Sequence, residues 1–156
     1  MKTILSVLLI FFLITGCSQG DEREPATEKS TIETMDTPEL KGTSWILTEL
    51  QEKSVRKSED WGVPEITFHK EDNRLSGYGG CNQLNGSFTL GDDNEVRFSQ
   101  IATTKRYCEP VMALEDNYLT MLNRVSSYRM DNETLILLFD DHTVAARFTL
   151  NTPVSD

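Results

Sequence analysis

The sequence predicts a mainly β fold: a small antiparallel β-barrel-like structure or strongly curved sheet of about eight strands, with one α-helix near residues 110–125. Three observations predict it. Short segments after residue 40 alternate apolar and polar residues, turn sequences rich in Gly, Asp and Asn separate them, and one stretch places apolar residues three and four apart. Antiparallel strands joined by hairpins favour such a barrel, in which a helix covers an open edge or mouth.

Five strands are expected before the helix and three after it. The first strand contains Trp45, Leu47 and Leu50 in an apolar run, which suits a strand buried on much of both faces. The others alternate around apolar residues, as at Ile66 and Phe68, and are bounded by hairpin-type turns. The segments assigned before the helix are 45–50, 65–69, 74–78, 87–90 and 95–98, and two of the three strands after it are assigned to 135–139 and 144–148.

The helix is predicted from an apolar stripe at steps of three and four residues, formed by Val111, Leu114, Tyr118, Leu122 and Val125. Pro110 suits the first helical position, where no backbone N–H is needed. Acidic Glu115 and Asp116 lie early in the segment and Arg124 lies late, which agrees with the helix dipole.

Residues 1–16 have the pattern of a signal peptide. Lys2 precedes the segment 4–14, which is apolar apart from Ser6 and is too short to span a membrane. The segment ends in Leu13-Ile14-Thr15-Gly16-Cys17, which resembles the lipobox of bacterial lipoproteins. That resemblance implies cleavage before Cys17 and attachment of fatty acyl chains there. The alternatives are an ordinary cleaved signal with an incidental cysteine, or an uncleaved anchor.

Residues 17–39 are expected to form the lipidated cysteine and a flexible acidic tether. Ser18–Glu39 carries seven acidic and two basic residues and has few apolar ones. A flexible chain of this length has an average end-to-end distance of roughly 25 Å, which would hold the domain at 40–150 just clear of a lipid surface. The expected location is the cell envelope. If the cell has two membranes, the resemblance to lipoproteins, whose residue after the cysteine governs sorting, implies the outer one, because that residue is Ser18 rather than Asp.

The net charge of −10 argues against a protein that binds nucleic-acid phosphates, because such binding needs a clustered excess of Lys and Arg. Half of this acidity lies in the tether. Residues 40–156 contain 12 basic and 18 acidic residues, so the domain is only moderately acidic.

Cys81 and Cys108 lie in loop-like sequence within an exported domain, where thiols usually meet oxidising conditions. A disulfide between them would close a 28-residue loop and stabilise the fold by roughly 3–4 kcal/mol. Free thiols or a metal-binding pair are the alternatives. Zinc would need two further ligands, and His69 and His142 lie at separate strand ends, so no metal is expected.

Several motifs resemble the META domain, the HslJ-like, heat-shock-associated family. They run in order over residues 40–148: Leu40–Leu47, Pro64–Phe68, Arg74–Gly77 with Gly80-Cys81-Asn82 and Gly86, Ile101–Thr104 with Cys108, and Leu135–Leu137. Gln83-Leu84 departs from the basic and aromatic pair more usual after Gly-Cys-Asn. The resemblance implies a small β-barrel-like fold with a helix, export, and links to heat shock, envelope stress or motility. Gly80, Asn82, Gly86 and Thr104 are its motif residues, with structural or contact roles.

No catalytic residues or cofactor are expected. The sequence contains no nucleophile elbow, phosphate loop or His-Glu-x-x-His motif, and a Cys–His pair would have no local signature. The expected function is therefore a non-catalytic, monomeric binding or structural module. Its partners would be membrane lipid, through acylated Cys17, and an unidentified envelope protein. The alternative is a carrier of lipid or another small apolar ligand, which would need a hollow barrel.

Overall fold

The structure is a computed structural model that describes residues 39–58 and 60–152, all within one compact unit. The predicted signal peptide, the lipid attachment site Cys17 and the tether up to residue 38 lie outside the described residues. No helix in the described part of the chain is long and apolar enough to span a bilayer.

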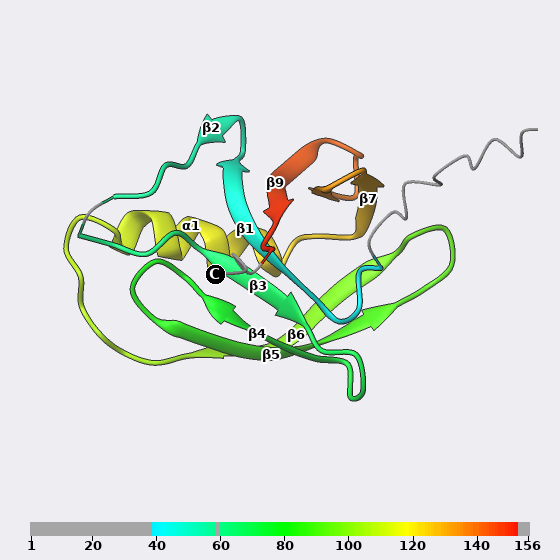
Figure 1. Cartoon of the computed structure of the whole chain (residues 1–156), viewed down its shortest axis with the longest axis horizontal. Helices are drawn as coiled ribbons and strands as arrows, with labels where there is room; N and C mark the ends of the chain where they lie inside the picture. Colours follow the sequence, from blue (N-terminus) through cyan, green and yellow to red (C-terminus); the bar gives the residue numbers. More distant parts are fainter. Residues whose placement is uncertain (1–38, 59, 153–156) are drawn as a thin grey trace, which may run out of the picture. The chain divides into compact units, whose positions relative to one another are not determined.

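The described residues form nine antiparallel strands and one helix, which confirms the predicted fold class (Figure 1). Eight strands follow one path through the sheet in the order β6-β5-β4-β3-β1-β9-β8-β7, and the two-residue β2 pairs antiparallel with the C-terminal end of β1. The elements are β1 (Thr43–Leu50), β2 (Lys53–Ser54), β3 (Glu65–Phe68), β4 (Arg74–Tyr78), β5 (Gln83–Leu90), β6 (Val96–Thr103), α1 (Met112–Leu122), β7 (Ser127–Asp131), β8 (Thr134–Leu138) and β9 (Val144–Leu150).

The sheet curls until its two end strands, β6 and β7, meet at one point. Glu95 pairs with Ser127, and the N–H of Val96 donates to the carbonyl oxygen of Ser126 at 3.0 Å. The N–H of Tyr128 donates to the carbonyl oxygen of Asn94 at 3.0 Å. The sheet is therefore a half-barrel whose ends are hydrogen-bonded at one place. Helix α1 connects β6 to β7 and packs its apolar face into the same core as the sheet.

The interior of the half-barrel is filled by side chains. Trp45, Phe68, Phe88 and Phe148 are buried there with Tyr118, Met121 and Leu122 of α1. The rings of Phe68 and Phe88 pack edge to face with centroids 5.1 Å apart. Phe139 lies half-buried at the surface, where the guanidinium of Arg124 sits 4.7 Å from its ring centroid.

The helix is shorter than predicted, and two strands lie where no segment was assigned. Pro110 belongs to a turn before α1, and Val111 is the N-cap residue. Strands β5 and β6 extend beyond their predicted segments, and their pairing shifts register between Asn85 and Ser87. The unassigned strands are β2 and β7; β7 has only half-buried or exposed residues and so carries a weak apolar alternation.

Candidate functional site

Three segments that are distant in sequence meet beside the first turn of α1. They are the turn between β4 and β5, the segment that follows β6, and the helix itself. A disulfide joins Cys81 of the turn to Cys108 of the second segment, with Cα atoms 5.9 Å apart. We call the residues that hold these segments together the clamp: Cys81, Asn82, Thr104, Arg106, Cys108 and Glu115.

The centre of the clamp is the carboxylate of Glu115, which is only 3% exposed. Its Oε2 accepts the backbone N–H of Cys81 at 3.1 Å and that of Asn82 at 2.7 Å. Its Oε1 accepts the side-chain Nδ2 of Asn82 at 2.6 Å. A buried carboxylate is costly unless it is hydrogen-bonded, and charge-assisted bonds of this kind are among the stronger ones in proteins. Glu115 therefore fixes the β4–β5 turn onto the helix.

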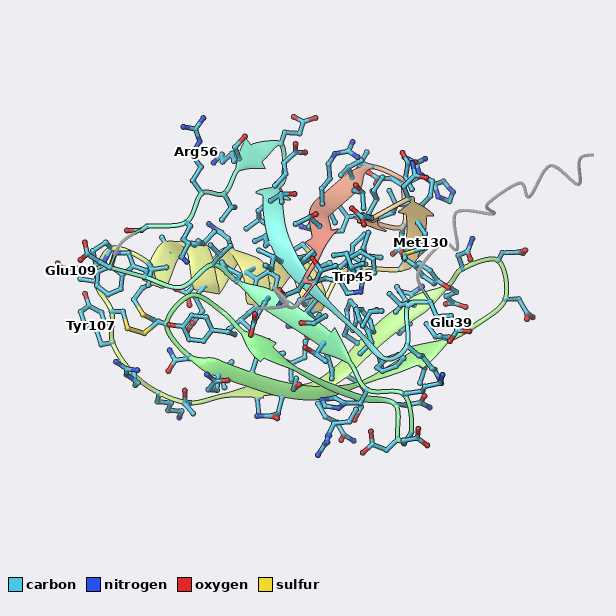
Figure 2. All side chains as sticks on the ribbon, in the orientation of Figure 1. Glu39, Trp45, Arg56, Tyr107, Glu109 and Met130 are labelled. Carbon is cyan, nitrogen blue, oxygen red and sulfur yellow. A yellow bond between two sulfur atoms is a disulfide. The ribbon has the colours of Figure 1, made fainter. Side chains whose placement is uncertain are left out.

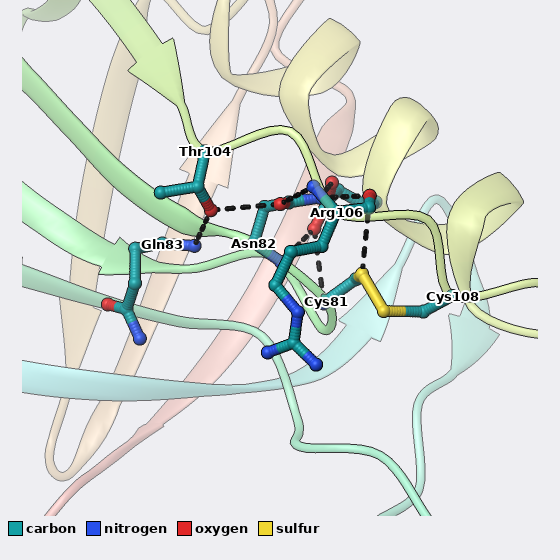
Figure 3. The surroundings of a disulfide bond; sticks show 7 residues. Cys81, Asn82, Gln83, Thr104, Arg106 and Cys108 are labelled. Atoms are coloured by element: carbon teal, nitrogen blue, oxygen red, sulfur yellow. Dashed lines mark hydrogen bonds between the residues drawn. A yellow bond between two sulfur atoms is a disulfide. The ribbon is translucent and has the colours of Figure 1, made fainter.

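The side chain of Asn82 connects Glu115 to the segment after β6 (Figure 3). Its Oδ1 accepts the hydroxyl of Thr104 at 2.9 Å and the backbone N–H of Arg106 at 2.7 Å, and its Nδ2 also donates to the carbonyl oxygen of Arg106 at 3.1 Å. Asn82 is 1% exposed, so the amide is buried with every polar atom in use. The hydroxyl of Thr104 accepts the N–H of Gln83 at 3.1 Å, which extends β5 pairing past the end of β6.

Two glycines are needed for the turn to reach the helix. Gly80 has φ of +110°, in the region that favours glycine, and a Cβ there would lie 2.8 Å from Cγ2 of Val111. A Cβ on Gly79 would lie 2.6 Å from Oε2 of Glu115. The absence of a Cβ at Gly79 thus lets the turn lie against the Glu115 carboxylate, and its absence at Gly80 lets the turn lie against Val111.

An apolar layer covers the disulfide. Cys81, Cys108 and Val111 are buried together, and Trp61 and Met112 pack against them partly exposed. Sγ of Cys81 lies 3.6 Å from the carbonyl oxygen of Arg106. A disulfide sulfur has no hydrogen to donate, so this is a van der Waals contact. Trp61 is therefore a half-buried packing residue of this layer.

The structure brings Gly80, Asn82 and Thr104 together with both cysteines, but it places Gly86 elsewhere. Gly86 lies within β5, beside the register shift, where a Cβ would be 3.1 Å from the carbonyl oxygen of Ser99. The role of Glu115 in the clamp was not predicted from the sequence, in which this residue was assigned to the helix dipole. Its position four residues after Val111 and three before Tyr118 places it on the buried stripe, and an acidic residue there is the signal that could have identified it.

The clamp is suited to holding a loop rather than to supplying a reactive group. Both sulfurs are bonded to each other, and both oxygens of Glu115 accept N–H donors. His69, considered as a base or zinc ligand, shares a hydrogen bond of 2.7 Å with Ser76 on the neighbouring strand. Within residues 39–58 and 60–152, no three His, Cys, Asp or Glu residues cluster as metal ligands.

Comparison with known proteins places these features in a family. A family model of the META domain matches residues 38–151, a range that includes the half-barrel, α1 and the clamp. The chain is similar to a protein from Burkholderia xenovorans solved by NMR, with 26% identity and a TM-score of 0.58 over 73% of this chain and 85% of that one. A second NMR structure, at 24% identity, gives a TM-score of 0.54 over 69% of this chain and 88% of that one, and shares the fold. No curated protein matches the sequence significantly.

Proposed function

The chain belongs to the META domain family, and from that premise we propose that it is a membrane-anchored lipoprotein of the cell envelope. Its META domain is a non-catalytic binding or structural module that acts in the response to envelope or heat stress. The lipid anchor is Cys17, which ends the lipobox-like sequence of residues 13–17. In a cell with two membranes, the protein is placed in the outer one.

The filled core is the observation that carries the binding-module proposal. Large side chains from the sheet and from α1 occupy the interior, and Trp45, Phe68 and Phe148 are fully buried there. In the described part of the chain, no buried side-chain polar atom lacks a hydrogen-bond partner. Because large side chains pack the interior and no buried side-chain polar atom of the described residues lacks a hydrogen-bond partner, the outer surface is the proposed place of interaction.

The same observation disfavours a carrier of lipid or another apolar ligand. Three grooves on the described residues lie at the surface and have volumes of about 410, 480 and 460 Å³. The groove of about 480 Å³ is lined in part by Glu39, Leu90 and Tyr128, and charged residues also line the other two. Native mass spectrometry of the protein purified from membranes should show the acylated chain without a co-purified lipid ligand.

The anchor is tested by changing its cysteine. In cells, the Cys17→Ala variant should leave the membrane fraction, while the wild-type chain should stay in it and yield an acylated N-terminal Cys17 peptide by mass spectrometry. A wild-type peptide without acyl chains would contradict the lipoprotein assignment.

The module is tested by crosslinking in intact cells under heat and oxidative stress, together with size-exclusion chromatography of the purified protein. We expect a monomer in solution and a discrete crosslinked complex in stressed cells. A monomer that forms no complex under either stress would count against a binding role.

A further inference from the structure

We propose that the loop Thr104–Cys108, here called the Tyr107 loop, is the site where this domain docks onto an acidic surface of a partner protein. This inference rests on the proposed function and names the chemistry of its partner. The loop follows β6 and carries Lys105, Arg106 and Tyr107 in succession.

The side chains of Lys105, Arg106 and Tyr107 face solvent. Tyr107 is 78% exposed, and Leu90, at 39%, is the other exposed large apolar residue among those described. Lys105 and Arg106 are exposed, and neither makes an ion pair with any described residue. Tyr and Arg are the residue types, with Trp, that dominate binding energy at protein interfaces.

The backbone of this loop is held by hydrogen bonds and by the disulfide. The N–H of Thr104 donates to the carbonyl oxygen of Gln83 at 3.1 Å, Asn82 bonds both the N–H and the carbonyl of Arg106, and Cys108 is held by the disulfide. Tyr107 thus lies between two anchored residues. Binding through such a loop loses little backbone entropy, because the backbone is ordered beforehand. The clamp thus has a role in binding, because it holds Tyr107 at the surface in a fixed position for a partner.

Charge selects the partner. Lys105 and Arg106 give the loop two positive charges in a domain with six more acidic than basic residues, and Glu109 is the nearest acidic residue in sequence. An acidic partner surface would be attracted to this loop and repelled by most of the remaining surface, which fixes the orientation of docking.

The position of the loop favours a protein over the bilayer. Tyr107 and Glu39 lie at opposite ends of the domain (Figure 2). The tether joins the domain at Glu39. In a domain anchored through Cys17, the end that carries Tyr107 is therefore the end farthest from this junction. The tether is itself acidic, so it adds no attraction to anionic lipid.

The test places the photoreactive amino acid p-benzoylphenylalanine at position 107 of the full chain in living cells. The matched control places it at position 90, the other exposed apolar site, at the far end of strand β5 from the clamp. We expect a discrete protein adduct from position 107 that is absent from position 90, with the crosslinked partner peptide rich in Asp and Glu. Equal adducts from both positions, a neutral or basic partner peptide, or an adduct with phospholipid would overturn the proposal.

Charge reversal provides the second readout. Lys105→Glu with Arg106→Glu should lower the yield of the position-107 adduct about tenfold, because the attraction that orients docking is reversed. Lys70→Glu with Arg129→Glu changes the net charge equally at exposed sites outside the loop and should leave the yield nearly unchanged. Equal yields from the two double variants, each verified as folded by circular dichroism, would overturn the proposal.

These outcomes are separable from the proposed function. Acylation of Cys17 and membrane fractionation report on the anchor and do not depend on position 107. An acylated, membrane-bound protein that forms a stress-induced complex by general crosslinking, yet gives no adduct from position 107, would refute the Tyr107 loop alone.

Discussion

The core of the half-barrel and the clamp are both buried, but they are stabilised by different forces. The core consists of apolar side chains such as Trp45, Phe68 and Phe148, and its stabilisation scales with the area removed from water. The clamp consists of directional bonds on Asn82 and Glu115 at 2.6–3.1 Å, closed by a disulfide. The core can exchange one apolar shape for another, whereas the clamp needs particular atoms at particular distances.

This difference implies different consequences when each region is damaged. A lesion in the core should weaken the whole fold, because strands and α1 share one apolar cluster. A lesion in the clamp should release the Tyr107 loop and the β4–β5 turn while much of the sheet remains formed. Stability measurements combined with local probes can separate the two.

The largest effect is expected from Phe68→Ala in the core. Phe68 is fully buried against Phe88 and Phe98, so its removal should reduce the free energy of unfolding by about 3–5 kcal/mol. Urea unfolding followed by circular dichroism measures this. The control is Phe139→Ala, a half-buried surface position, which should cost clearly less. Equal losses would show that burial does not set the energetics of this core.

The disulfide should contribute the next largest effect. Replacing both Cys81 and Cys108 by Ser removes a constraint on a 28-residue loop and should cost about 3–4 kcal/mol. The urea midpoint of the double variant, compared with that of the wild type under oxidising and reducing conditions, tests this. The reduced wild type should resemble the variant. A midpoint of the wild type that does not change on reduction would contradict the prediction.

Glu115→Gln should act locally and cost about 1–3 kcal/mol. The glutamine has nearly the same shape, but its NH₂ group would face N–H donors that now meet a carboxylate oxygen. Amide hydrogen exchange should accelerate at Cys81, Asn82 and Arg106 more than in β8, which lies in the core. Asp116→Asn, an exposed neighbour, should change stability by less than about 0.5 kcal/mol. A uniform acceleration across the sheet would show that the clamp is part of the global unfolding unit.

The same contrast explains how much of the molecule could be predicted from sequence. Periodic apolar residues indicate which face of a strand or helix is buried. Examples are Ile66 and Phe68 in a strand and Tyr118 and Leu122 in the helix, and all four are buried in the structure. The fold class follows from such periodicity. The pattern is weaker for β7, where Tyr128 and Met130 alternate with polar residues but are only half-buried at an end strand of the sheet.

The clamp could be predicted only in part. Cys81, Asn82 and Thr104 belong to recognisable motifs, but the bonds between them depend on where a turn, a strand end and a helix come together. Glu115 carries no local signal except its place on an apolar stripe. A buried carboxylate is stable there because Cys81 and Asn82, 34 and 33 residues away in sequence, supply N–H donors from the backbone and from the Asn82 side chain.

The smallest effect on stability is expected at Tyr118, a residue of α1 that is buried in the core, and it should be seen only at high pH. Burial raises the pKa of its hydroxyl well above the usual value, and the nearby Glu65 carboxylate adds to this. An unfolded tyrosine ionises near pH 10, so above that pH the unfolded state loses a proton that the native state keeps. Stability should therefore be complete below pH 10 and fall above it, by at most about 1.4 kcal/mol per pH unit from this one group.

Tyr118→Phe removes this titration and keeps the ring. The hydroxyl makes only a long hydrogen bond of 3.4 Å, to the carbonyl oxygen of Glu65, so the variant should cost no more than about 1 kcal/mol at pH 7. Urea midpoints measured from pH 9 to pH 11 should fall more steeply for the wild type than for Tyr118→Phe. Tyr78, Tyr107 and Tyr128 are present in both proteins, so their titration cancels in the comparison. Parallel pH profiles would show that water reaches Tyr118 before the fold is lost. The core would then open locally, as is expected of the clamp, and the two regions would not differ in this respect.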